Sequence, residues 1–139
     1  MAFLNYFDHH DRKKTRSHLK DLVRVALADE ILKDEEKQFL ERVATNAGIG
    51  PEELKEIIDE VTHIEFIPPT ELDQKFEQLF NIARLIMIDD HIHEKEIEYC
   101  IHFGHTLNFD DQFTKKLIAE LEEDPKADGD DMFEKLLKK

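Results

Sequence analysis

Side chains that can bind a divalent cation gather in one short segment of this chain. Asp89, His91 and His93 lie almost next to one another, and Glu96 follows shortly after them. Carboxylate oxygens and imidazole nitrogens are common ligands of divalent metal ions in proteins. If the chain turns at this point, the four side chains can converge, so the segment is a candidate metal site.

A second acidic segment lies sixty positions earlier, where Asp29 and Glu36 have the same spacing as Asp89 and Glu96. Hard cations such as calcium and magnesium prefer oxygen ligands of this type. The EF-hand template fits neither segment, because acidic residues stand where its loop requires glycine. The candidate metal ligands of the whole chain are Asp29, Glu36, Asp89, His91, His93 and Glu96.

Helix capping is a simpler use of the same acidic residues. A carboxylate at the start of a helix accepts hydrogen bonds from unpaired backbone N–H groups and opposes the helix dipole. Each such residue contributes about 0.3 to 1 kcal/mol without any metal. Specific cation binding and capping alone therefore both remain open for these segments.

A catalytic centre or a cofactor site finds little support in the residue types. Cys100, the single cysteine, lies beside Ile97 and Ile101 on an apolar helical face, which predicts a buried thiol. The chain has no glycine-rich phosphate loop and no serine in the setting of an activated nucleophile. His102 and His105 complete no metal-binding motif, so we expect surface histidines. We therefore predict a protein that is not an enzyme. It has no catalytic residue and no established cofactor, with a divalent metal as an option.

The charge of the chain is strongly negative and unevenly distributed. The net charge is −14, but residues 1–24 hold six basic and three acidic side chains, so the remainder carries −17. Such a surface repels phosphate backbones, which excludes nucleic acid as a partner over a broad area. The basic cluster consists of Arg12, Lys13, Lys14, Arg16, Lys20 and Arg24.

This basic cluster has more than one use. It can contact an acidic protein, or anionic headgroups at a membrane surface. It can equally pair with the protein's own acidic residues. No apolar run approaches the roughly twenty residues that span a bilayer, and the first residues lack a secretory layout. We therefore expect a cytoplasmic protein that has no transmembrane segment and that binds a protein partner, with peripheral membrane contact as an option.

The chain contains an internal repeat, whose two copies are offset by sixty residues. The two acidic segments occupy equivalent places in these copies. Apolar residues agree in register between the two copies, which predicts the same core face in each half. For example, Phe39 and Val43 correspond to Tyr99 and Phe103. Between residues 22 and 61, the residues identical to those sixty positions later form these pairs: Arg24 and Arg84, Asp29 and Asp89, Glu36 and Glu96, Lys55 and Lys115, Ile58 and Ile118, and Glu60 and Glu120.

The apolar residues recur at helical spacing, and glycine and proline are few. Gly48 is typical of a helix end, and Pro51 of a helix start. We predict an all-α protein, a compact bundle of about six to seven helices built from two similar three-helix halves. It forms a single domain over residues 1–139, with halves at about 15–61 and 70–122 and a connector near Pro68 and Pro69. Residues 123–139 form an amphipathic tail that needs to dock on the core.

The two acidic segments, each between apolar helices, resemble the tellurite-resistance TerB-like family, which includes the N-terminal domain of DjlA-type co-chaperones. The resemblance covers roughly residues 15–122. Glu30 and Asp90 depart from it, because the family has glycine at these positions. The matching residues are Ala28, Asp29, Leu32 and Glu36 in the first copy and Asp89, Ile92 and Glu96 in the second.

The resemblance implies an accessory or scaffold domain in stress-related systems, associated with divalent metal and the inner face of the membrane. It implies no particular reaction. We therefore expect a non-enzymatic interaction domain, whose acidic helix junctions are candidates for a divalent cation. The alternative is a metal-dependent enzyme or metal sensor centred on the segment from Asp89 to Glu96.

Overall fold

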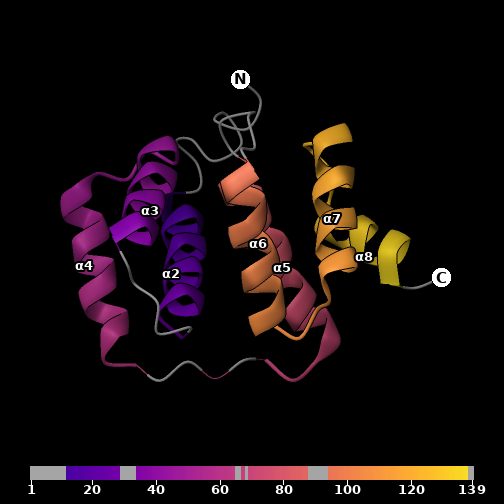
Figure 1. The fold of residues 1–139 in the computed structure, drawn as a ribbon, viewed down its shortest axis with the longest axis horizontal. Helices are drawn as coiled ribbons and strands as arrows, with labels where there is room; N and C mark the ends of the chain where they lie inside the picture. Colours follow the sequence, from indigo (N-terminus) through magenta and orange to yellow (C-terminus); the bar gives the residue numbers. More distant parts are fainter. Residues whose placement is uncertain (1–11, 29–33, 65–66, 68, 88–93, 138–139) are drawn as a thin grey trace.

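The protein is described by a computed structural model over residues 12–28, 34–64, 67, 69–87 and 94–137. Within these ranges it is all-helical, with seven helices and no strand, so the predicted fold class is confirmed (Figure 1). The helices are α2 (Arg12–Ala28), α3 (Asp34–Asn46), α4 (Pro51–Thr62), α5 (Leu72–Ile86), α6 (Glu94–Thr106), α7 (Asp111–Glu123) and α8 (Gly129–Leu137).

The sixty-residue repeat reappears in the helix boundaries. Helices α3 and α6 both contain 13 residues and begin at Asp34 and Glu94, sixty positions apart. Helices α4 and α7 begin at Pro51 and Asp111, with the same offset. The order of elements α2, α3, α4 is thus repeated as α5, α6, α7, and α8 follows as an addition to the second copy.

The two copies also end their middle helix in the same way. Gly48 and Asn108 both adopt the left-handed conformation, with φ of 83° and 69°. The N–H of Ile49 donates to the carbonyl of Ala44 at 2.8 Å, and the corresponding bond from Phe109 has the same length. This is the Schellman arrangement, in which glycine or asparagine reverses the chain after a helix. Gly48 therefore ends α3, as the sequence predicts.

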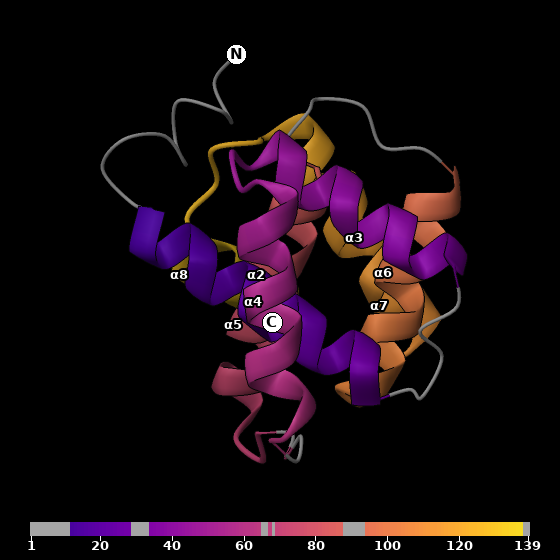
Figure 2. The ribbon, with the colours of Figure 1, turned by 90° about the vertical axis from the view of Figure 1, so that its left-hand side faces the viewer.

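Two of the three pairs of equivalent helices are in contact, whereas α4 and α7 lie at opposite sides of the molecule (Figure 1). Helix α2 packs on its counterpart α5, and Phe39 of α3 stacks on Tyr99 of α6 with ring centroids 4.4 Å apart. Figure 1 shows α2, α3 and α4 on one side and α5 to α8 on the other, and Figure 2 shows α2 crossing behind α4. Contacts between equivalent residues are expected when two similar halves are related by an approximate two-fold rotation.

A single apolar core joins the halves and includes residues of all seven described helices. Phe80 points into it from α5, as the periodicity predicts, and is 3% exposed. The tail forms α8 and docks on α5, with Met132 buried and Gly129 against the ring of Phe80. Lys135 of α8 pairs with Glu120 of α7, which raises the pKa of the lysine. The amphipathic tail is therefore held by both apolar and ionic contacts.

Helices α6 and α7 approach each other closely at Gly104. A Cβ atom at this position would overlap the side-chain hydroxyl of Thr114, which is fully buried. The equivalent residue in the first half is Ala44, so the second half requires a smaller residue here. None of the helices in the described part of the chain is long and apolar enough to cross a membrane.

Candidate functional site along helix α5

Two of the six predicted cation ligands lie in the described part of the chain. Glu36 is in the first turn of α3, and Glu96 is at the equivalent place in α6. Among described residues, no group of three or more histidine, cysteine, aspartate or glutamate side chains is arranged to hold a metal ion. The other four predicted ligands lie outside the described residues: Asp29, Asp89, His91 and His93.

The two described glutamates point inward rather than into solvent. Glu96 is 0% exposed, and the Oε2 atom of Glu36 is also buried. Both side chains interact with neighbouring groups. A buried carboxylate needs such interactions, because its removal from water is costly. Glu36 and Glu96 therefore connect the starts of α3 and α6 to the interior, and cation binding at these segments remains a prediction.

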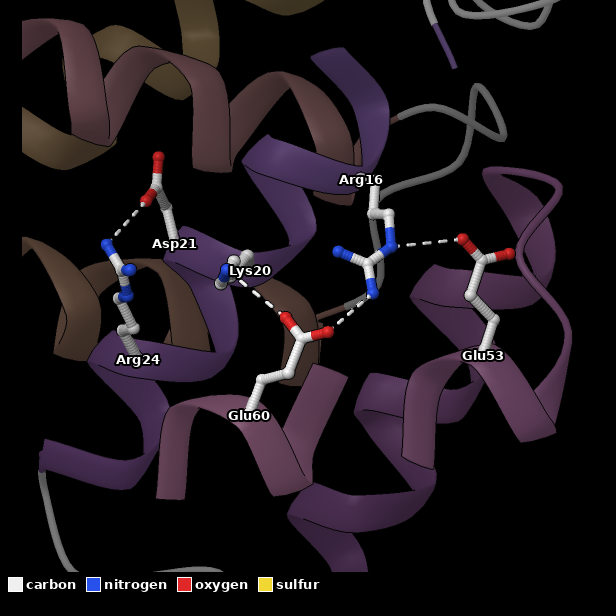
Figure 3. Close-up of polar contacts among 6 residues, drawn as sticks. All are labelled: Arg16, Lys20, Asp21, Arg24, Glu53 and Glu60. Atoms are coloured by element: carbon white, nitrogen blue, oxygen red, sulfur yellow. Dashed lines mark hydrogen bonds and ion pairs between the residues drawn. The ribbon is translucent and has the colours of Figure 1, made fainter. Parts of the chain in front are cut away.

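The basic cluster of the sequence is largely used within the protein (Figure 3). The Nε atom of Arg16 lies 3.3 Å from Glu53 Oε2, and its Nη2 atom lies 3.1 Å from Glu60 Oε1. The Nζ atom of Lys20 lies 3.2 Å from Glu60 Oε2. Hydrogen bonds from Arg16 and Lys20 lower the pKa of the Glu60 carboxyl. Two of the basic side chains thus join α2 to α4, as in the intramolecular interpretation.

Asp21 lies on the other side of α2, facing α5. Its Oδ1 atom is 3.7 Å from Arg24 Nη1 (Figure 3). Burial raises the pKa of this carboxyl, whereas Arg24 and a hydrogen bond with Gln78 oppose the rise. The carboxyl opens onto a polar hollow of about 200 Å³ between α2 and α5. This hollow is lined by Asp21, Pro69, Gln74, Glu77, Gln78 and Asn81.

A larger pocket of about 340 Å³ adjoins this hollow, on the side of α5 that faces α8. The two hollows share Glu77 and Asn81, so they follow the same face of α5. The residues that line the larger pocket are Asp73, Phe76, Glu77, Phe80, Asn81, Arg84, Asp128, Gly129, Asp130 and Phe133.

The floor of the larger pocket is aromatic. Phe76 and Phe80 are buried, and Phe133 of α8 is partly buried; we call these three residues the phenyl floor. The rings of Phe76 and Phe133 meet edge to face, with centroids 5.4 Å apart. Such pairs hold the ring faces in a fixed orientation. The floor therefore joins α8 to α5. Phe76 and Phe80 are only 2% and 3% exposed, so Phe133 supplies most of the accessible aromatic surface at the bottom of the pocket.

Carboxylates surround this floor. Asp73 and Glu77 stand one helical turn apart on α5, and Asp128 and Asp130 flank the start of α8. All four are exposed to solvent; we call them the rim carboxylates. The pocket is thus apolar at its base and anionic at its mouth.

Among the residues that the structure describes, Arg84 is the only basic residue that lines the pocket. It is 5% exposed, and its Nη2 atom donates to the carbonyls of Ala127, at 2.7 Å, and Pro125, at 3.3 Å. Its guanidinium carbon lies 5.0 Å from the ring centroid of Phe80. Arg84 therefore fixes the segment between α7 and α8, and its charge is directed toward backbone carbonyls.

Three described side chains that could carry chemistry, those of Cys100, His102 and His105, are not part of the pocket lining. Cys100 is fully buried, and burial raises the pKa of its thiol to about 12, as expected for a packing residue rather than a nucleophile. His102 and His105 are exposed, as predicted, and His105 forms a hydrogen bond with Asp111 at the junction of α6 and α7.

Sequence reasoning did not identify this pocket. One signal was present, because Asp73, Glu77 and Asn81 recur every four residues and so share one face of a helix. Another was the identity of Arg84 with Arg24 in the repeat. Neither signal indicates that α8 closes the pocket.

Comparisons with protein-family models, with curated proteins and with solved structures give no match for this chain. The pocket between α5 and α8 is therefore the feature on which a function can be based.

Proposed function

We propose that this protein is a non-enzymatic accessory domain of the TerB-like type, which recruits a basic protein partner through the face formed by α5 and α8. The observation that carries the proposal is the pocket of about 340 Å³, with a phenyl floor and four rim carboxylates. An apolar base surrounded by charges of one sign suits a partner that contributes both apolar contact and positive charge.

The charge of the whole protein supports a basic partner. The chain carries a net charge of −14, and Arg16 and Lys20 are already paired with Glu53 and Glu60. Opposite charge steers a partner toward its binding face and raises the association rate, an effect that salt reduces. A nucleic acid does not fit, because its phosphates would meet the rim carboxylates.

The non-enzymatic part of the proposal is supported by the chemistry of the described side chains. The single thiol is buried, and its pKa is raised to about 12, so a thiolate is not formed near neutral pH. The rim carboxylates are open to water, whereas carboxylates that act as general acids are typically enclosed in a partly apolar site. A role in binding fits these properties better than a role in catalysis.

The TerB-like resemblance adds a stress-related setting to this proposal and leaves a divalent cation as an option that calorimetry can test. A cation at the segments that contain Asp29 and Asp89 would modulate the domain and is not required for the α5 and α8 face to bind a partner. The two roles occupy different parts of the chain, so each can be tested without the other.

A peptide-display selection tests the proposed function. The immobilised full chain is exposed to random peptides at near-physiological salt, and enriched peptides are sequenced. We expect enrichment of peptides that combine lysine or arginine with apolar residues, and weaker retention of these peptides at high salt. Failure to enrich any peptide, or enrichment of acidic ones, would contradict the proposal.

A further inference from the structure

We infer that the pocket between α5 and α8 binds one lysine or arginine side chain of the partner, as an anchor. The aliphatic stem of this side chain lies on the phenyl floor, and its cationic head lies among the rim carboxylates. This inference rests on the proposed function and adds the chemical group that the pocket recognises.

The size of the pocket fits such an anchor. Ligand sites in proteins have volumes of roughly 300 to 1,000 Å³, and this pocket, at about 340 Å³, is at the lower end of that range. One long side chain with its flanking backbone suits this space better than a large cofactor. Both α5 and α8 contribute exposed carboxylates to the lining, such as Glu77 and Asp130, so we expect a peptide to contact both helices and direct one side chain inward.

The phenyl floor suits the stem of a long basic side chain. Lysine and arginine lay their methylene groups on apolar surface and keep the charged head in water. A cation is also attracted to the face of an aromatic ring. The pocket already contains one such contact, because the guanidinium of Arg84 lies 5.0 Å from the ring centroid of Phe80. Phe133, which is partly buried, supplies accessible aromatic surface for the stem, whereas Phe76 is 2% exposed and lies beneath it.

The rim carboxylates provide the charge that selects a cation. Four carboxylates and the guanidinium of Arg84 give the pocket a formal charge of −3. Arg84 donates to the backbone carbonyls of Pro125 and Ala127, so its charge is used within the protein. No other basic side chain of the described ranges lines the pocket. An incoming ammonium or guanidinium group therefore meets carboxylates that its own charge can neutralise, whereas an anionic side chain would be repelled.

Small amides can separate the contributions of stem and charge. The full chain, labelled with ¹⁵N, is titrated with Nα-acetyl-lysine N-methylamide while backbone amide signals are followed by NMR. The same titration is repeated with the norleucine amide, which keeps the stem without the charge, and with the diaminopropionic amide, which keeps the charge on a short stem. We expect dissociation constants in the millimolar range, roughly −4 kcal/mol of binding free energy for the lysine amide.

The expected result is selective binding at the pocket. The lysine amide should shift signals of α5 near Asn81 and of α8 near Gly129. Each of the two analogues should have a dissociation constant at least roughly fivefold higher than that of the lysine amide. Equal binding of the lysine and diaminopropionic amides would overturn the inference, because general attraction to the acidic surface would then explain the effect. Absence of binding, or shifts spread evenly over the surface, would overturn it as well.

A variant with a neutral rim tests the location directly. The pocket variant carries Asp73→Asn, Glu77→Gln and Asp130→Asn, which keep the shape of the side chains and remove three charges. It should bind the lysine amide roughly tenfold more weakly than the wild type. Circular dichroism and thermal unfolding establish that the variant is folded.

A control variant removes the same number of charges elsewhere. It carries Glu41→Gln, Glu56→Gln and Asp59→Asn, which alter exposed carboxylates of α3 and α4, on the side of the molecule opposite α8 (Figure 1). The control should bind the lysine amide as the wild type does. Equal weakening of both variants would overturn the inference.

The two proposals fail in different ways. Binding of the lysine amide in the pocket, together with a failed peptide selection, would support the anchor site and contradict partner recruitment. Enriched peptides that bind the pocket variant as tightly as the wild type would support recruitment and contradict the anchor site.

Discussion

Asp21 is a carboxylate on which burial and neighbouring charge act in opposite directions. Burial raises its pKa, and Arg24 and Gln78 only partly offset the rise. A raised folded-state pKa means that ionised Asp21 destabilises the folded protein above that pKa. The resulting loss of unfolding free energy disappears as the pH falls through the folded-state pKa toward the ordinary value of 3.8. We therefore expect Asp21→Asn to be at least as stable as the wild type at pH 7.

Urea unfolding at pH 7 and near pH 4 measures this effect. The difference between Asp21→Asn and the wild type should shrink at the lower pH. Asn81 stands at the equivalent position of the second half, so the substitution makes the two halves alike. Glu60→Gln is the opposite control, because the lowered pKa of Glu60 gives stability that is present above its ordinary value of 4.5 and lost in acid. An Asp21→Asn protein that is less stable than the wild type at both pH values would contradict the argument.

Gly104 is a residue at which the contact between two helices leaves no space for a methyl group. Gly104→Ala places its Cβ against the hydroxyl of buried Thr114. Overpacking typically costs about 1 to 3 kcal/mol, which exceeds the gain of roughly 1 kcal/mol from replacing glycine in a helix. We expect a net loss of unfolding free energy in urea titrations. Thr114→Ala in the same chain should recover part of the loss, and additive effects of the two substitutions would contradict a direct contact.

At the scale of elements, the docking of α8 depends on Phe80. This ring is 3% exposed, contacts Gly129 at the start of α8 and lies under the guanidinium of Arg84. Phe80→Ala should reduce the unfolding free energy by about 3 to 5 kcal/mol, as for other buried phenylalanines. Chemical denaturation tests the value, and Phe3→Ala, which lies outside the described residues, should have a smaller effect. A nearly neutral Phe80→Ala would show that the ring contributes little to the core.

Several elements could be predicted from sequence because their signals are local. Gly48 ends α3, and Pro51 begins α4, since each residue favours one backbone conformation at a helix boundary. The constant register of apolar residues predicts two similar sets of helices, which the boundaries of α3 and α6 match. Local preference and side-chain periodicity are sufficient for these features.

The position of α8 could not be predicted in the same way. Its apolar residues predict an amphipathic helix but give no information about which helix it contacts. One interaction that positions the segment before α8 is the hydrogen bond from Arg84 to the carbonyl of Ala127, which joins residues 43 positions apart. Ala127 lies just before the start of α8, and Gly129 and Phe133 of α8 line the pocket. The contact therefore helps to place one wall of the pocket. A periodic sequence indicates a face of a helix, whereas a pocket requires the relative placement of two faces.

At the scale of the whole molecule, cation binding and partner binding can be separated by calorimetry. Chelated wild-type protein is titrated with calcium, magnesium, manganese and zinc. We expect no specific, stoichiometric binding event, because capping and buried interactions account for acidic residues at helix starts. The variant Asp89→Asn with Glu96→Gln should keep its helical content and lose some stability, since Glu96 is fully buried. A single high-affinity site that this variant lacks would make the second acidic segment the functional centre.

The distribution of charge gives the molecule two different sides. On the side of α2 and α4, the basic residues Arg16 and Lys20 are paired with glutamates. On the side of α5 and α8, the rim carboxylates surround a pocket with an aromatic floor. Among described residues, one basic side chain lines this pocket, and it is directed toward backbone carbonyls. A basic partner is therefore expected at the second side, and the strength of its binding should fall as salt rises.

Calorimetric titration of an enriched basic peptide is the most direct test of partner recruitment through the α5 and α8 face. The peptide is titrated into the wild type, the pocket variant and the control variant at the same salt concentration. Saturable binding to the wild type and to the control, with roughly tenfold weaker binding to the pocket variant, is the predicted result. Equal affinity for all three proteins, or no binding to the wild type, would contradict it.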